Sequence, residues 1–205
     1  FKKVYAAVDP AISKKKKAHY TAILVVGLTD SGERYVLETV CKRGMTTADT
    51  VDSLINLWKR WRFNILGVEA VAYQEALVNS LKDRFREEGG RLFRTKEFKS
   101  GNIERKDLRI RALQPSFKNG WWFISSTQQL LRTQLQEYPF GNYNDLLDAL
   151  AYIHKLLPTH DGKNKVERPN KEFEAKTTVT YEELMNELEG GGSSGSLFEL
   201  QDHAP

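Results

Sequence analysis

The fold of this chain is decided by three stretches near its N-terminus: KVYAAVD (3–9), HYTAILVVGL (19–28) and ERYVLETVC (33–41). All three are rich in Val, Ile, Leu, Tyr and Thr, and they are separated by Pro, Ser, Lys, Asp and Gly. This pattern predicts β-strands, and TDSG (29–32) is typical of a tight turn. We therefore expect three strands, with the second and third forming a hairpin.

Helical and strand patterns alternate in the residues that follow. A helix is predicted from Thr46, which forms a capping-box pattern with Asp49, and NILGVEA (64–70) is predicted to be a strand buried on both faces. The remaining predicted elements are a helix over 74–88, a strand RLFRT (91–95), a basic segment and helix reaching 119, a strand WWFI (121–124), a helix from 127 and a final helix over 144–157. This succession predicts an α/β fold with a mixed central sheet, three antiparallel strands then parallel strands, flanked by helices.

The composition excludes several classes of protein. The chain has 205 residues, of which 40% are hydrophobic, so it can form one substantial core. With one cysteine and no apolar run of about 18 residues, a disulfide scaffold, a zinc site and a membrane span are not expected. We interpret Cys41 as a small buried hydrophobic residue. The chain begins at Phe1 without a signal-peptide pattern, so we expect a segment of a longer intracellular protein.

Charge divides the chain into two parts. Residues 1–157 hold 26 Lys or Arg against 17 Asp or Glu, whereas residues 158–205 hold 5 against 10. The second part also contains GGGSSGS (190–196), which is typical of a flexible linker. We expect one domain over 1–157 and an acidic, partly flexible tail over 158–205 that serves as a docking segment for a partner.

Isolated acids follow the predicted strands and begin the final helix. Asp9 ends the first strand, Glu69 lies near the end of the buried strand 64–70, and Asp145 and Asp148 lie in the first turn of the final helix. Acids in a first helical turn are also favoured simply because they face unpaired backbone N–H groups. If the first and fourth strands are neighbours, however, Asp9 and Glu69 meet at one sheet edge, and the helix start can join them.

Such a cluster of carboxylates predicts a bound divalent cation. Several acids without a basic partner repel one another, and a cation holds them together. An all-oxygen set of ligands favours Mg²⁺ or Mn²⁺, and two such ions about 4 Å apart can promote phosphodiester cleavage. The sequence therefore permits a two-metal nuclease.

Four motifs carry a family resemblance: VYAAVDPA (4–11), ILGVEA (65–70), KDLRIRALQPSFKNGWWFI (106–124) and YNDLLDALAYI (143–153). In this order they resemble the nuclease domain of the large terminase subunit of tailed bacteriophages, over roughly residues 1–157. The resemblance implies an RNase H-like (RuvC-like) fold and metal ligation by Asp9, Glu69 and Asp145, with Asp148 as a fourth catalytic acid. Because Asn144 stands where the family often has a first acid, Asp145 and Asp148 both remain candidates for the principal ligand.

The resemblance also implies an activity and partners. It implies an endonuclease that uses two Mg²⁺ or Mn²⁺ ions to cut concatemeric double-stranded DNA during phage packaging in the host cell cytoplasm. The expected partners are DNA, the portal, the small terminase subunit and an N-terminal ATPase domain of the same polypeptide. No phosphate loop is present here, since Gly27 to Gly32 is followed by Glu33, so the ATPase is expected outside this chain.

Basic residues indicate where DNA would bind. Residues 91–111 hold eight Lys or Arg and three acids, and Lys14 to Lys17 follow the strand that ends at Asp9. Such residues contact phosphates without reading sequence, and we single out Lys99, Arg105 and Lys106. Of the adjacent Trp121 and Trp122, one must face the core if this segment is a strand. His19 and His154 lie in apolar patterns and are not expected to be catalytic.

Two other functions remain open from the sequence. A Holliday-junction resolvase of the same fold would share the metal site and prefer branched DNA. A non-catalytic DNA-binding or capsid-docking module would use the same acids only as helix caps.

Overall fold

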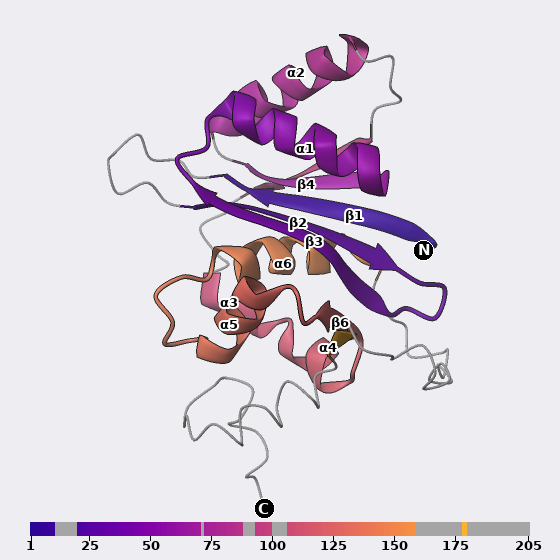
Figure 1. Cartoon of the computed structure of the whole chain (residues 1–205), viewed down its shortest axis with the longest axis vertical. Helices are drawn as coiled ribbons and strands as arrows, with labels where there is room; N and C mark the ends of the chain where they lie inside the picture. Colours follow the sequence, from indigo (N-terminus) through magenta and orange to yellow (C-terminus); the bar gives the residue numbers. More distant parts are fainter. Residues whose placement is uncertain (11–19, 71, 88–92, 100–105, 159–177, 180–205) are drawn as a thin grey trace, which may run out of the picture.

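The computed structural model describes residues 1–10, 20–70, 72–87, 93–99, 106–158 and 178–179. A single sheet forms the middle layer, with helices on both faces (Figure 1). The described strands are β1 (Lys3–Asp9), β2 (Tyr20–Leu28), β3 (Arg34–Arg43), β4 (Ile65–Ala70), β5 (Arg94–Lys99), β6 (Trp122–Ser125) and β7 (Thr178–Val179). Their order across the sheet is β5-β4-β1-β2-β3-β6-β7.

The strand directions confirm the expected fold class. β1, β2 and β3 form an antiparallel meander, whereas β4 is parallel to β1 and β5 is parallel to β4. This is the mixed sheet expected for an RNase H-like fold, three antiparallel strands and then parallel ones. β2 lies in the middle of the sheet and is buried along nearly its whole length, which explains its continuous apolar run.

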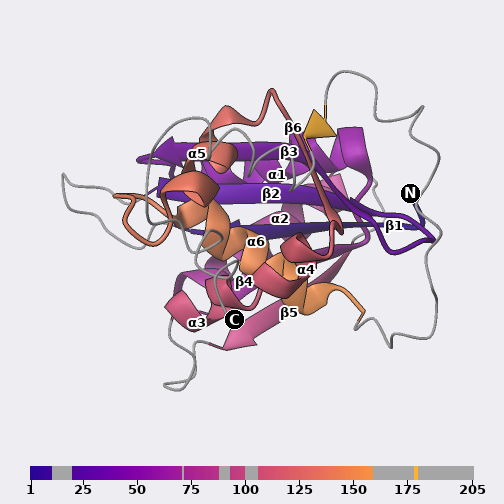
Figure 2. The ribbon, with the colours of Figure 1, turned by 90° about the horizontal axis from the view of Figure 1, so that it is seen from below.

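Helices cover the two faces of the sheet unequally. α1 (Thr47–Trp61) and α2 (Ala72–Glu87) lie on one face, and α6 (Asp145–Leu156) crosses the other face together with α3 (Lys106–Arg111), α4 (Gln114–Lys118) and α5 (Gln129–Glu137) (Figure 2). The predicted capping box at the start of α1 is present: the Thr46 hydroxyl accepts from the Asp49 N–H, and the Asp49 carboxylate accepts from the Thr46 N–H. None of the described helices is long and apolar enough to cross a membrane.

Side chains alternate between two cores. Ala6, Val8, Ile23 and Val25 pack against α1 and α2, whereas the next residues along each strand pack against α6. α6 approaches the sheet closely at Gly67, where a Cβ atom would lie 2.6 Å from the Phe98 ring and 3.0 Å from Leu156. This close approach holds the last turn of α6 against β4 and β5.

Several predicted boundaries are wrong. The fifth strand runs over Arg94–Lys99 rather than 91–95, because β5 pairs with β4 through Ala70. The single helix predicted before residue 119 is two helices, α3 and α4, and Pro115 lies in the first turn of α4. The short strand β7, which pairs with β6, was not predicted within the tail. The GGGSSGS stretch lies outside the described residues.

Candidate active site

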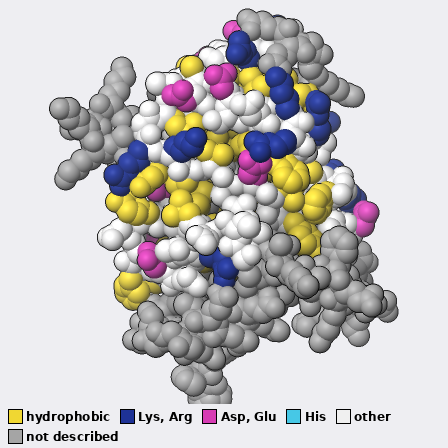
Figure 3. Space-filling view, in the orientation of Figure 1, with side chains coloured by type: hydrophobic (Ala, Val, Ile, Leu, Met, Phe, Trp, Pro, Cys, Tyr) yellow, Lys and Arg dark blue, Asp and Glu magenta, His cyan; other side chains and the backbone are white. Residues whose placement is uncertain are grey.

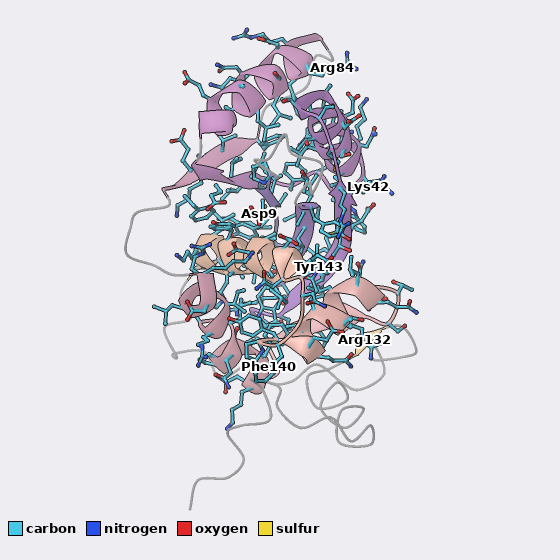
Figure 4. The ribbon with its side chains drawn as sticks, turned by 90° about the vertical axis from the view of Figure 1, so that its left-hand side faces the viewer. Asp9, Lys42, Arg84, Arg132, Phe140 and Tyr143 are labelled. Carbon is cyan, nitrogen blue, oxygen red and sulfur yellow. The ribbon has the colours of Figure 1, made fainter. Side chains whose placement is uncertain are left out.

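Two neighbouring parallel strands bring Asp9 and Glu69 together. Val8 pairs with Val68 in the β1–β4 ladder, and Asp9 and Glu69 are the next residue of each strand. Both side chains are half-buried, and the alternation along β1 turns Asp9 toward α6. Asp9 and Glu69 therefore converge at one sheet edge, as predicted. Figure 4 views the molecule from the side at which β1 ends, and Asp9 lies near the middle of this view.

The first turn of α6 supplies the other two acids. Asn144 is the N-cap, Asp145 is the first helical residue, and Asp148 lies three residues further along in the same turn. The side chain of Asp145 is 17% exposed and that of Asp148 only 5% exposed. Because Asp148 is so deeply buried in an otherwise apolar helix, its charge must be compensated by the protein.

Asp148 has that compensation. Arg109 of α3 forms a bidentate (forked) ion pair with the Asp148 carboxylate. Its Nη2 donates to Oδ1 and Oδ2 at 2.9 Å each, and its Nε donates to Oδ1 at 3.1 Å. Lys106 Nζ lies 3.5 Å from Asp148 Oδ2 and 4.0 Å from Asp145 Oδ1. The expectation of acids without a basic partner is thus wrong for Asp148.

The acids act on one another electrostatically. Burial raises the pKa of Asp9 from 3.8 to about 8, with further increases from Asp148, Glu69 and Asp145 and a decrease from Lys106. The pKa of Asp148 is also raised by burial, against the opposing effects of Lys106 and Arg109. Asp9 therefore lies among negative charges in a place where adding a cation would be favourable.

The residues suit a divalent cation in kind, but they do not form a closed metal site. Carboxylate oxygens are the ligands that Mg²⁺ and Mn²⁺ prefer, and Asp9, Glu69 and Asp145 supply them. Within the part of the chain that the structure describes, no three His, Cys, Asp or Glu side chains are arranged to hold one ion together. Both oxygens of Asp148 already accept from Arg109, which favours Asp145 over Asp148 as the ligand from α6.

The predicted DNA contacts are only partly covered by the structure. Arg105, the side chain of Lys99 and Lys14 to Lys17 lie outside the described residues. Lys106 is described, and it points toward the acids. On the face drawn in Figure 3, described Lys and Arg side chains are interspersed with acidic and hydrophobic ones rather than gathered in one band.

Several other expectations can be compared with the structure. Trp122 is buried, stacks on Phe117 and donates to the Ser116 hydroxyl, as expected of the core-facing member of the pair. Cys41 is only half-buried, but it packs against the core. Burial and Arg34 lower the pKa of His154 to about 4, and the two side chains are 3.5 Å apart. His19 lies outside the described residues.

Sequence reasoning missed Arg109 and Tyr152. Arg109 was counted only as part of a basic segment, although its spacing of three residues from Lys106 places both on one side of a short helix. Tyr152 follows Asp148 by one turn, and burial together with the carboxylates of Asp148 and Glu69 raises its pKa. The Arg109 guanidinium lies 5.0 Å from the centre of the Tyr152 ring, so these residues form one packed support for Asp148.

Comparison with known proteins gives weak structural likenesses. No protein-family model and no curated protein sequence matches the chain. Among solved structures, RuvC of T. thermophilus in complex with a Holliday junction substrate is 13% identical over 73% of this chain and 89% of its own, with a TM-score of 0.42. The fowlpox virus Holliday junction resolvase is 9% identical over 75% and 97%, with a TM-score of 0.49. Because both scores are low, the fold assignment rests on the strand order and directions described above.

Proposed function

We propose that this chain is a divalent-metal-dependent DNA endonuclease, and specifically the nuclease domain of a phage terminase. The observation that supports it is the meeting of Asp9, Glu69 and Asp145, from three separate elements, at one sheet edge. Burial, and then the neighbouring acids, raise the pKa of Asp9 to about 8, so its ionised form destabilises the fold unless a cation binds it. Clusters of acids with a strongly raised pKa are common at catalytic and metal-binding sites.

In this proposal the four acids have two roles. Asp9, Glu69 and Asp145 hold two Mg²⁺ or Mn²⁺ ions, whose chemistry is to activate a water and neutralise the charge at the scissile phosphate. Asp148, fixed by Arg109, anchors the start of α6 and thereby positions Asp145. Lys106 neutralises the acids before the ions bind, and it is then free to contact a DNA phosphate.

The terminase assignment rests on the motifs that run from residue 4 to residue 153. By analogy with that family, the substrate is concatemeric double-stranded DNA, the portal and small terminase subunit are partners, and an ATPase belongs to the same polypeptide. A Holliday-junction resolvase is the second candidate, because it would use the same acids on the same sheet.

A plasmid-cleavage assay tests the enzyme proposal. With Mn²⁺ the protein should nick and linearise supercoiled plasmid, and Asp9→Asn should lower the rate roughly a hundred- to a thousandfold, about 3 to 4 kcal/mol of transition-state stabilisation. Asp30→Asn is the matched control, because Asp30 is an exposed acid paired with Lys2 in the turn between β2 and β3. Undiminished cleavage by Asp9→Asn would reject the assignment of the site.

A second substrate separates the two candidate nucleases. We expect linear duplex and a four-way junction of the same sequence to be cut at similar rates. Strong preference for the junction would support the resolvase and count against the terminase. Absence of metal-dependent cleavage of either substrate would favour a non-catalytic DNA-binding module.

A further inference from the structure

Arg43, the last residue of β3, is held between two aromatic rings. Its guanidinium lies 4.6 Å from the centre of the Tyr20 ring and 5.3 Å from that of Tyr143, and Nη2 donates to the Tyr143 hydroxyl at 2.7 Å. The two rings meet edge to face at 5.2 Å. Three segments that are far apart in sequence thus meet at one exposed cation.

This cluster lies beside the acids. Tyr20 pairs with Arg43 across β2 and β3, and two residues along β2 Ala22 pairs with both Asp9 and Cys41. Tyr143 precedes Asp145 by two residues. Burial, then Asp145 and Asp9, raise the pKa of Cys41 to about 11, in keeping with this end of β3 lying near both acids. Figure 4 labels Asp9 and Tyr143 within this region.

The surroundings of Arg43 fit an anionic ligand. The residue is exposed, and no described carboxylate lies within ion-pair distance of it. Two rings and a hydrogen bond already restrict its long side chain, so less conformational entropy is lost when its planar fork binds a phosphate. A phosphate close to the acids is repelled by them, and a fixed positive charge beside them offsets part of that repulsion.

We propose that Arg43, held by Tyr20 and Tyr143, binds a backbone phosphate of DNA next to the phosphate that is cut. This inference deepens the proposed function, because it takes DNA as the ligand of the same edge of the sheet. Arg43 contributes position and charge at this edge, and it takes no part in breaking the phosphodiester bond.

The test measures DNA binding without cleavage. Anisotropy of a short fluorescein-labelled duplex is titrated in EDTA at KCl concentrations between about 50 and 200 mM. Arg43→Ala should weaken binding about tenfold at the lowest salt and reduce the slope of log K against log salt by about 0.9, the value for one lost phosphate contact. Arg43→Lys should restore the slope but only part of the affinity, since it keeps the charge and loses the fork.

Arg62→Ala is the matched control. Arg62 lies 4.2 Å from the centre of the Trp58 ring, just after α1 and at the edge where β1 and β4 begin. The Arg62→Ala substitution removes the same charge from the same kind of aromatic contact, but at the opposite edge of the sheet. The affinity for the duplex and the slope of log K against log salt should therefore stay near their wild-type values. Tyr143→Phe should cost affinity without changing the slope, because it removes only the hydrogen bond to Arg43.

The outcomes separate this inference from the proposed function. An unchanged slope in Arg43→Ala, an equal loss in Arg62→Ala, or absence of duplex binding by the wild type overturns the role of Arg43. If Arg43→Ala behaves as expected but the wild type never cleaves DNA with Mn²⁺, the phosphate contact stands and the nuclease proposal fails. If the wild type cleaves DNA but Arg43→Ala binds the duplex like the wild type, the nuclease proposal stands and the role of Arg43 fails.

Discussion

Asp9, which is half-buried, and Asp148, which is buried, are two carboxylates of one cluster, and their surroundings differ. Asp148 is held by a forked pair from Arg109 and by Lys106, all within the layer formed by α3 and α6. Asp9 lies at the end of β1 with three other acids acting on it, and among the described residues Lys106 is the cation that lowers its pKa. Two cations of the fold pair with Asp148, whereas the charges around Asp9 are mostly negative.

This difference distinguishes a supporting acid from a ligand. A buried carboxylate with both oxygens engaged fixes the helix that presents its neighbour, but it has little capacity left for an ion. A carboxylate surrounded by other acids is unfavourable to the fold and favourable to a cation. We therefore assign Asp148 to positioning and Asp9 to binding, and the predictions below test that division.

The largest effect is expected from breaking the pair that supports Asp148. Arg109→Ala leaves a carboxylate that is 5% exposed without its forked partner, and it should lower the free energy of unfolding by about 3 kcal/mol or more. Urea unfolding measures this. Adding Asp148→Asn to Arg109→Ala should recover part of the loss, because the unpaired charge is then removed.

The exposed pair of Arg86 with Asp83 is the control for that experiment. Its closest atoms are 3.1 Å apart, but the side chains are 78% and 68% exposed. Arg86→Ala should therefore cost less than about 1 kcal/mol. Equal losses in the two variants would mean that Asp148 does not depend on Arg109.

A smaller effect is expected from the pH dependence of stability, and it concerns Asp9. The pKa of Asp9 is about 8 in the folded protein against 3.8 ordinarily, so between these values the unfolded chain loses the proton first. Ionisation therefore favours the unfolded state, and stability falls as pH rises through this range. Asp9→Asn lacks this loss, so its stability relative to wild type should increase from pH 4 to pH 8 by at least about 1.4 kcal/mol, the value of one pKa unit.

Urea unfolding in EDTA at several pH values across that range is the measurement. Adding Mn²⁺ at the upper end should stabilise the wild type and leave Asp9→Asn unchanged. A difference between the two proteins that is independent of pH would show that Asp9 is solvated or paired, like an ordinary surface acid.

The smallest effect is expected at Lys106, which lies between the two parts of the cluster. Its ammonium group is within 4.0 Å of Asp145 and of Asp148, so it competes with an added cation. Lys106→Met should tighten Mn²⁺ binding roughly fivefold, about 1 kcal/mol, the value of one unit charge at about 4 Å in water. Weaker Mn²⁺ binding in this variant would mean that Lys106 supports the site rather than opposes the ion.

The sequence predicted the strands and the acids because each depends on local patterns. Apolar runs ending in Asp9 and Glu69 indicated two buried strands, and the pattern of residues 144–157 indicated α6. The prediction that Asp9 and Glu69 meet required β1 and β4 to be neighbouring strands, and the sheet order confirms that they are.

What the sequence did not reveal depends on long-range pairing. Arg109 is 39 residues from Asp148, and Arg43 is 100 residues from Tyr143, so no local pattern connects them. The boundary of β5 was misplaced for the same reason, since pairing with β4 rather than its own composition sets its length.

Calorimetric titration with Mn²⁺ tests the central claim most directly, with wild type, Asp9→Asn, Asp145→Asn and Asp30→Asn measured side by side. The account predicts saturable binding by the wild type and by Asp30→Asn, and its loss in Asp9→Asn and Asp145→Asn. Binding of Mn²⁺ by Asp9→Asn with the heat and affinity of the wild type would contradict the claim that these acids form a cation site.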